Sequence, residues 1–266
     1  MVKNKFRKYF LIYLIQFYAY LTHEAGYRLS MLLSIIGSFV FVVYNLLVFS
    51  IFANMFSFPG WNKQDIWVLL GSFMIVFYSY FYFFYKGIIN TIRNVQSGKF
   101  DYFLLKPADT QLLATVLGGG IHNLLAVFFG IILTNWSLLR LNHVVPMGNI
   151  VLGSVLTMLS AVDLYSILLI MTSLSFRYGN VEDVTNFIFS FQIFSRYPIE
   201  TYHRLPVFLW LIVVPFSALT SIPAMTFTKN PPYYLPIGIY IFISLMVIGF
   251  ARYFFYRSIR HYSSGN

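Results

Sequence analysis

Two ionisable side chains lie inside long apolar runs, where they could do chemistry within a membrane. His122 lies ten residues into the run 112–134, and Asp163 lies thirteen residues before the end of the run 150–176. At a rise of 1.5 Å per residue these depths are about 15 and 20 Å, so the two side chains could meet near the middle of a bilayer. A charge there costs roughly 2.5–3.5 kcal/mol without a partner or water. We therefore predict that His122 and Asp163 pair, either as a structural contact or along a transport pathway.

A second candidate lies at the end of a short apolar run. Arg196 and Glu200 are four residues apart, one turn of a helix, so they could form a salt bridge. The pair is predicted to be a solvated or structural ion pair, and the alternative is an outer gate formed by Arg196, Tyr197 and Glu200.

Other chemistry has little support in the sequence. The His, Asp and Glu residues show no metal-binding spacing, and the chain has no cysteine. Gly98-Lys99 is the only Gly-Lys pair and lacks the glycine five residues earlier that a phosphate-binding loop needs. We predict that the chain is not an enzyme and binds no cofactor.

The segment Val95 to Pro107 is the most polar interior stretch, and it reads VQSGKFDYFLLKP. Gly98 can end a helix in the left-handed conformation, and Pro107 stops further helix. Between them, apolar and charged residues alternate as in an amphipathic piece at an interface. The segment is therefore either a loop resting on lipid headgroups or a docking element for a soluble partner.

Composition indicates an integral membrane protein, because 59% of the 266 residues are apolar and only 10% are charged, against roughly 25% charged in soluble domains. The net charge of +10 is carried at the ends of apolar runs. It is explained by membrane lipid and topology rather than by nucleic acid.

The apolar runs predict an all-α membrane protein forming one domain over 1–266. An interfacial helix is expected over 9–27 and a re-entrant helical hairpin over 205–227, where Pro206, Pro215 and Pro223 interrupt the pattern. Three glycines at 118–120 favour either close helix approach or a local break. Six spans are expected at about 29–52, 66–85, 112–134, 150–176, 179–196 and 237–255.

The distribution of Lys and Arg predicts the topology. With a cytoplasmic N-terminus, inside segments hold 13 of these residues and outside segments hold 5. The positive-inside rule then places both termini and the loop 94–110 in the cytoplasm of a multi-pass protein.

These segments together resemble a known family over essentially the whole chain. Its motifs are Ala25-Gly26-Tyr27-Arg28, Gly60-Trp61, the run from Ser97 to Pro107, Arg196-Tyr197-Pro198, Ile222-Pro223-Ala224 and Arg260-His261-Tyr262-Ser263-Ser264. The chain is similar to the ABC-2-type permeases, in the branch of about 260 residues often encoded as paired permeases beside an ATPase.

The resemblance implies a bacterial cell-membrane protein with six spans, an interfacial helix, and a coupling loop at 94–110 for a separate ATPase that binds ATP and Mg. It also implies a second permease subunit, identical or paralogous. Lys99-Phe100 departs from the glutamate-leucine common at this point, which could alter which ATPase is accepted. The coupling residues implied are Gly98, Lys99, Asp101, Leu104, Leu105, Lys106 and Pro107.

The favoured function is the permease subunit of an ATP-driven exporter for a small molecule, peptide or lipid-like substrate. An ion-coupled secondary transporter that uses His122 and Asp163 as a proton relay is the alternative. A lipid-modifying membrane enzyme would need a His/Asp or His/Glu cluster near one interface, which the sequence lacks.

Overall fold

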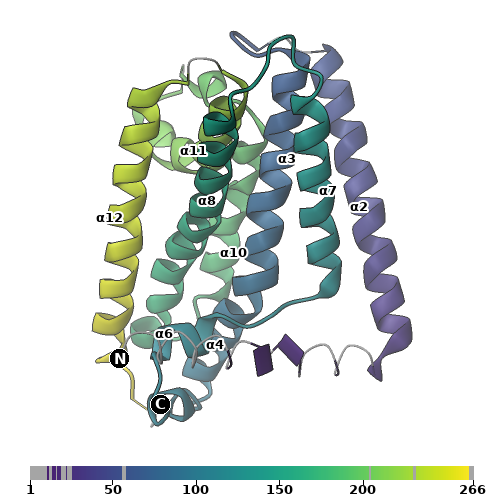
Figure 1. The fold of residues 1–266 in the computed structure, drawn as a ribbon. Helices are drawn as coiled ribbons and strands as arrows, with labels where there is room; N and C mark the ends of the chain where they lie inside the picture. Colours follow the sequence, from purple (N-terminus) through teal and green to yellow (C-terminus); the bar gives the residue numbers. More distant parts are fainter. Residues whose placement is uncertain are drawn as a thin grey trace.

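The computed structural model describes residues 11, 14–15, 17–18, 22, 26–55, 58–203, 205–229 and 232–263. Long helices run side by side and form an elongated bundle, and short helices lie at its lower end (Figure 1). The elements in chain order are α2 (Arg28–Met55), α3 (Lys63–Tyr80), the π-helix η1 (Phe81–Tyr85), α4 (Lys86–Gln96), α5 (Asp101–Leu104), α6 (Thr110–Thr115), α7 (Ile121–Leu138), α8 (Met147–Ser173), α9 (Ser175–Tyr178), α10 (Glu182–Ser190), the 3₁₀ helices η2 (Phe191–Arg196) and η3 (Ile199–Tyr202), α11 (Val207–Thr228) and α12 (Tyr234–Ile259).

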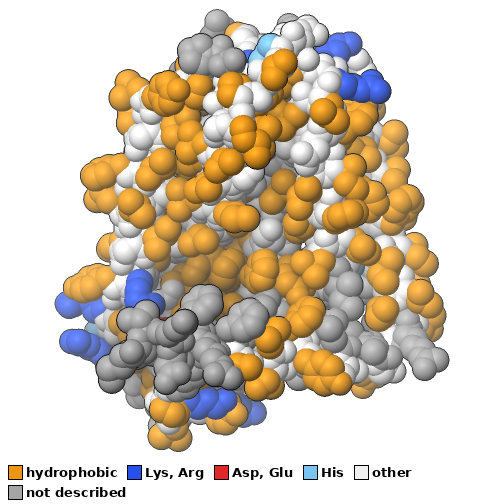
Figure 2. Space-filling model, viewed as in Figure 1, with side chains coloured by type: hydrophobic (Ala, Val, Ile, Leu, Met, Phe, Trp, Pro, Cys, Tyr) orange, Lys and Arg blue, Asp and Glu red, His pale blue; other side chains and the backbone are white. Residues whose placement is uncertain are grey.

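The described part of the chain contains five helical stretches long and apolar enough to cross a membrane. The shortest has 22 residues, and about 20 suffice for the hydrocarbon core. Apolar side chains cover the middle of the visible face, and Lys and Arg gather near its ends (Figure 2). The protein is therefore an integral membrane protein. The five stretches are Leu29–Met55, Lys63–Gln96, Met147–Tyr178, Val207–Thr228 and Tyr234–Ile259.

Helix α3 is the central helix of the bundle. In the apolar stretch of its span, 72% of the residues are buried inside the protein. The corresponding share is only 17% in α2 and in α12, so these two helices face outward. Gly71 lets α3 approach α7 closely, because a side chain there would overlap the Thr134 hydroxyl and crowd the Gly130 backbone. Helices α8, α11 and α12 meet around a second apolar cluster. Its buried members are Leu156, Ile222, Ile237 and Tyr240.

The third predicted span differs from the observed one. Residues 112–134 were expected to form one helix, but α6 ends at Thr115, residues 116–120 are not helical, and α7 begins at Ile121. Of the two roles considered for the three glycines, the local break is observed. Glycine destabilises a helix, and at Gly119 a side chain would press on the carbonyl of Phe81.

The region after α9 also differs from expectation. The fifth span predicted over 179–196 is a nine-residue helix, α10, continued by the 3₁₀ helix η2. The hairpin predicted over 205–227 is not found, because α11 is one continuous helix through Pro215 and Pro223. A proline removes one backbone donor, but packed neighbours let a membrane helix continue through it.

The expected interfacial helix over 9–27 falls mostly outside the described residues. The predicted spans 29–52, 66–85, 150–176 and 237–255 correspond to α2, α3 with η1, α8 with α9, and α12.

Candidate functional site: the α5 surface, its anchors and a membrane cavity

The polar segment predicted from the sequence begins where α4 ends. The N–H and the Oγ of Ser97 both donate to the carbonyl of Arg93, at 3.0 and 2.9 Å. Gly98 then has a φ of +67°, the left-handed conformation that glycine adopts at low cost. The chain therefore turns at Gly98, as the sequence predicts, and delivers α5 beyond the end of α4.

The residues of this turn divide into an anchor and an exposed surface. Phe100 is fully buried, with its ring 4.8 Å from that of Phe176 and 5.7 Å from that of Tyr262. Its backbone N–H donates to the Tyr262 Oη at 3.2 Å. In contrast, Tyr102 is 62% exposed and Leu105 is 84% exposed. We call the outward residues the α5 surface, which comprises Tyr102, Leu104, Leu105, Lys106 and Pro107.

Lys106 contributes a charge to this surface, and its Nζ lies 3.6 Å from the centre of the Tyr102 ring. Asp101 is half-buried and Lys99 is exposed beside it. The structure thus gathers the predicted coupling residues at one end of the bundle, and it adds two that were not singled out. Tyr102 belongs to the surface and Phe100 holds it, and neither role could be assigned before the direction of each ring was known.

A polar network joins the next helix, α6, to two long helices. The Asp109 carboxylate accepts a hydrogen bond from the Leu112 N–H at 3.1 Å, which caps α6, and another from Arg252 Nη2 on α12 at 2.6 Å. Arg252 also donates to Gln111 Oε1 at 3.3 Å, and Gln111 Nε2 donates to the hydroxyl of Tyr165 on α8 at 2.9 Å. These hydrogen bonds link the end of the 94–110 segment to α8 and α12.

The electrostatics of this end follow from its hydrogen bonds. Partial burial alone would raise the pKa of Asp109, but the hydrogen bonds from Leu112 and Arg252 outweigh it and leave the pKa below its ordinary value. Glu182 accepts two hydrogen bonds from the Arg93 guanidinium, at 2.8 and 3.2 Å, which lower its pKa. This fork ties α4 to α10.

The opposite end of the bundle holds a second polar cluster. Buried Asp65 accepts from Lys229 Nζ at 2.7 Å and from the Asn62 N–H at 3.0 Å. Trp61 Nε1 donates to Glu200 Oε2 at 2.9 Å. The connection between α2 and α3 is therefore fastened both to η3 and to the end of α11.

This cluster corrects the predicted pair of Arg196 and Glu200. Glu200 bonds Trp61, whereas the Arg196 guanidinium lies 5.1 Å from the centre of the Phe73 ring. Four-residue spacing makes neighbours only on a continuous α-helix. Here the 3₁₀ helix η2 ends at Arg196 and Tyr197 is extended, with φ −122° and ψ 151°.

The predicted pair of His122 and Asp163 is not brought together either. Asp163 lies on α8, where its carboxylate accepts a hydrogen bond from the Ser244 hydroxyl of α12. His122 lies in the first turn of α7, and α7 and α8 each pack on α3 rather than on one another (Figure 1). Counting residues along each helix places His122 and Asp163 at similar depths in the membrane, but it does not determine which helices are neighbours.

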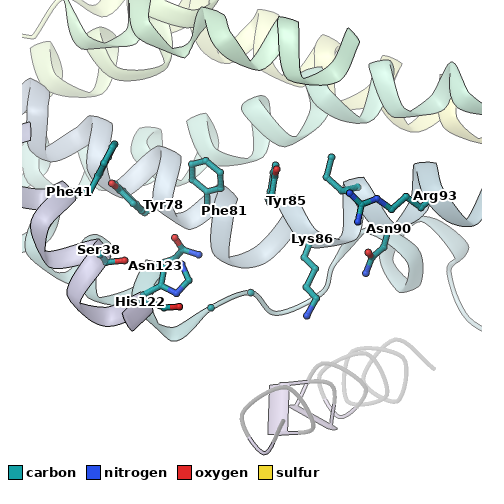
Figure 3. A pocket seen from close by; sticks show the side chains of 15 residues that line it. Ser38, Phe41, Tyr78, Phe81, Tyr85, Lys86, Asn90, Arg93, His122 and Asn123 are labelled. Carbon is teal, nitrogen blue, oxygen red and sulfur yellow. The ribbon is translucent and has the colours of Figure 1, made fainter. Parts of the chain in front are cut away.

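His122 instead lines a cavity of about 760 Å³ between α2, η1, α4 and the non-helical residues before α7. Figure 3 shows Ser38 of α2 and Asn123 of α7 beside His122, and Lys86 at the other end of the view, toward Arg93. Among the described residues no group of His, Asp and Glu could hold a metal ion.

The bundle and its sites define a multi-pass helical membrane protein with a structured polar segment projecting from one end. A family model described as ABC-2 family transporter protein matches residues 38–265. The chain therefore belongs to the ABC-2 family of transporter proteins, which confirms the resemblance seen in its motifs, and it is a membrane component of a transport system. No curated protein and no solved structure matches the chain.

Proposed function

We propose that this chain is the permease subunit of an ATP-binding-cassette exporter that moves a small molecule, peptide or lipid-like substrate. A separate ATPase subunit, which binds ATP and Mg, docks on the loop 94–110. That loop and both termini face the cytoplasm of the cell that carries the protein in its membrane. The exposed α5 surface is the observation that carries this proposal.

The α5 surface suits a soluble partner better than lipid. Charged residues surround it, so it lies outside the hydrocarbon region, where exposed apolar groups mark interaction sites. Tyr102 offers the kind of aromatic anchor that dominates protein interfaces, and Leu105 stands beside it almost fully exposed. The buried ring of Phe100 packs on Phe176 of α9 and on Tyr262, and so anchors the turn that carries both residues.

The same geometry supplies a route for coupling. A displacement of α5 would be transmitted to α12 through the contact of Phe100 with Tyr262. It would be transmitted to α8 through the hydrogen bond of Gln111 with Tyr165. Closure of the ATPase subunits on ATP would thus tilt two membrane helices. A second permease copy, identical or paralogous, would complete the pathway against the outward-facing α2 or α12.

Capture of the ATPase tests this proposal. The tagged chain, purified in mild detergent, is expected to bring down a subunit with a phosphate-binding loop and Mg-dependent ATPase activity. Leu105→Asp should abolish this capture. Leu139→Asp should leave it intact, because Leu139 is 88% exposed, close to the 84% of Leu105, but follows α7 at the other end of the bundle. Equal capture by both variants would overturn the proposal.

The proton-relay alternative receives no support from the geometry. It required His122 and Asp163 to exchange a proton, and the structure gives Asp163 a partner on α12 and His122 a place in a separate cavity.

A further inference from the structure

We propose that the cavity between α2, η1, α4 and α7 binds an amphiphile with an anionic head group. The head group lies at the α4 rim and the apolar body lies along an aromatic wall. This inference rests on the proposed transport function and names its substrate class.

The aromatic wall is continuous from the middle of α2 to the start of α4. Its rings follow one another, with centroids 6.3 Å apart for Phe41 and Tyr78, 6.2 Å for Tyr78 and Phe81, and 5.2 Å for Phe81 and Tyr85. The last two residues belong to the π-helix η1, a rare geometry that recurs at functional sites. An acyl or aryl body could lie along these rings.

The charge of the lining favours an anion. Lys86 and Arg93 of α4 lie at one end of the aromatic wall, and none of the described residues lining the cavity is acidic. Arg93 donates two N–H groups to Glu182, and a guanidinium has five. It therefore keeps donors for a phosphate, sulfate or carboxylate, which a planar guanidinium binds well.

Neutral polar groups in the lining add hydrogen bonds. Asn90, Asn123 and Ser38 line it, and the Tyr78 hydroxyl is buried without a hydrogen-bond partner among the described residues. A buried hydroxyl left unsatisfied is costly, and an ester or hydroxyl oxygen of a ligand would satisfy it. The volume of about 760 Å³ falls within the roughly 300–1,000 Å³ of sites for small organic ligands.

The test uses the purified chain in a neutral detergent with dodecyl phosphate as the probe. Dodecyl phosphate should raise the unfolding temperature by several degrees, because a ligand stabilises the state that binds it. Dodecyltrimethylammonium and inorganic phosphate, which each lack one part of the recognised structure, should not. A shift with dodecyltrimethylammonium equal to that with dodecyl phosphate would overturn the proposal.

Two variants locate the site. Ser38→Trp fills the cavity and should remove the shift, whereas Ser50→Trp on the same helix, equally half-buried but outside the cavity, should keep it. Should Ser38→Trp not fold, Lys86→Gln decides the question. It should weaken binding about tenfold, whereas Lys63→Gln at the other end should not. A full shift in Lys86→Gln would refute the assignment.

Nanodiscs distinguish a membrane lipid from a soluble anion. If the ligand is an anionic lipid, the lipid of phosphatidylglycerol discs should already occupy the cavity, so dodecyl phosphate should not raise the unfolding temperature further there. In phosphatidylcholine discs it should still raise it. If the ligand is a soluble anion, dodecyl phosphate should raise the unfolding temperature equally in both kinds of disc. Capture of the ATPase is measured separately, so a chain that captures it without binding dodecyl phosphate refutes only this inference. The reverse result refutes only the proposed function.

Discussion

The ammonium Nζ of Lys229 lies 2.7 Å from the Asp65 carboxylate, although 164 residues separate the two in the chain. Asp65 is almost fully buried, and Lys229 is partly buried beside the Trp61 ring. The pair fastens the end of α11 to the beginning of α3.

Loss of Lys229 should therefore destabilise the protein strongly. Lys229→Met leaves a buried carboxylate without its counter-ion, and such losses cost about 3–5 kcal/mol. Unfolding in a graded series of denaturing detergent measures the change. The double variant Asp65→Asn/Lys229→Met should be less destabilised than the sum of the single variants, and strict additivity would contradict the pairing.

Substitution of Phe100 should reduce folding stability, whereas substitution of Tyr102 should reduce docking of the ATPase. Phe100→Ala empties a fully buried site and should cost about 3–5 kcal/mol of folding free energy. Tyr102→Ala, on the exposed side of the same turn, should change stability by only about 0.5 kcal/mol while weakening capture of the ATPase. If Tyr102→Ala unfolds the chain, the division into anchor and surface is wrong.

Gly71 should tolerate no side chain, because the α3–α7 contact occupies its space. Gly71→Ala forces the Thr134 hydroxyl aside and should cost about 1–3 kcal/mol by overpacking. Gly249→Ala on α12 meets open space and should be neutral or slightly stabilising, since alanine favours helix. Thermal unfolding of the two variants side by side measures the difference.

Acidification should destabilise the end of the bundle that carries α5. The pKa values of Asp109 and Glu182 are depressed in the folded protein, so their contribution to stability is present above the unfolded values, about 3.9 and 4.3. It is lost as the pH falls through the lower folded values. Unfolding temperatures from pH 7 to pH 3 should decline below about pH 4, and less steeply in Asp109→Asn. Parallel curves for the variant and the parent would contradict this.

Asp163 should couple to Ser244 and not to His122. A double-mutant cycle of His122→Ala and Asp163→Asn should be additive within about 0.5 kcal/mol, because Asp163 bonds Ser244 of α12 whereas His122 lines a separate cavity. The cycle of Asp163→Asn and Ser244→Ala should show an interaction energy above that value. Coupling of His122 with Asp163 in a transport assay would restore the proton-relay mechanism.

The sequence by itself determined the membrane class, most of the long helices and the place of the turn at Gly98. Each of these depends on local properties, namely the apolar length of a segment, the helical rise and the conformations open to glycine or proline. It also identified the segment 95–107 as the most polar interior stretch, since charged residues within an apolar sequence can be recognised without knowledge of the fold.

Only the tertiary structure decided which residues meet. Depth along the membrane normal can be counted from the sequence, but the sideways order of helices depends on how their side chains pack, and lipid is as apolar as leucine. His122 and Asp163 were therefore matched in height yet lie on helices separated by α3, while Asp65 found its partner at Lys229. The pairing of Arg196 with Glu200 failed for a related reason, because packing against α11 accompanies a 3₁₀ turn where an α-helix was assumed.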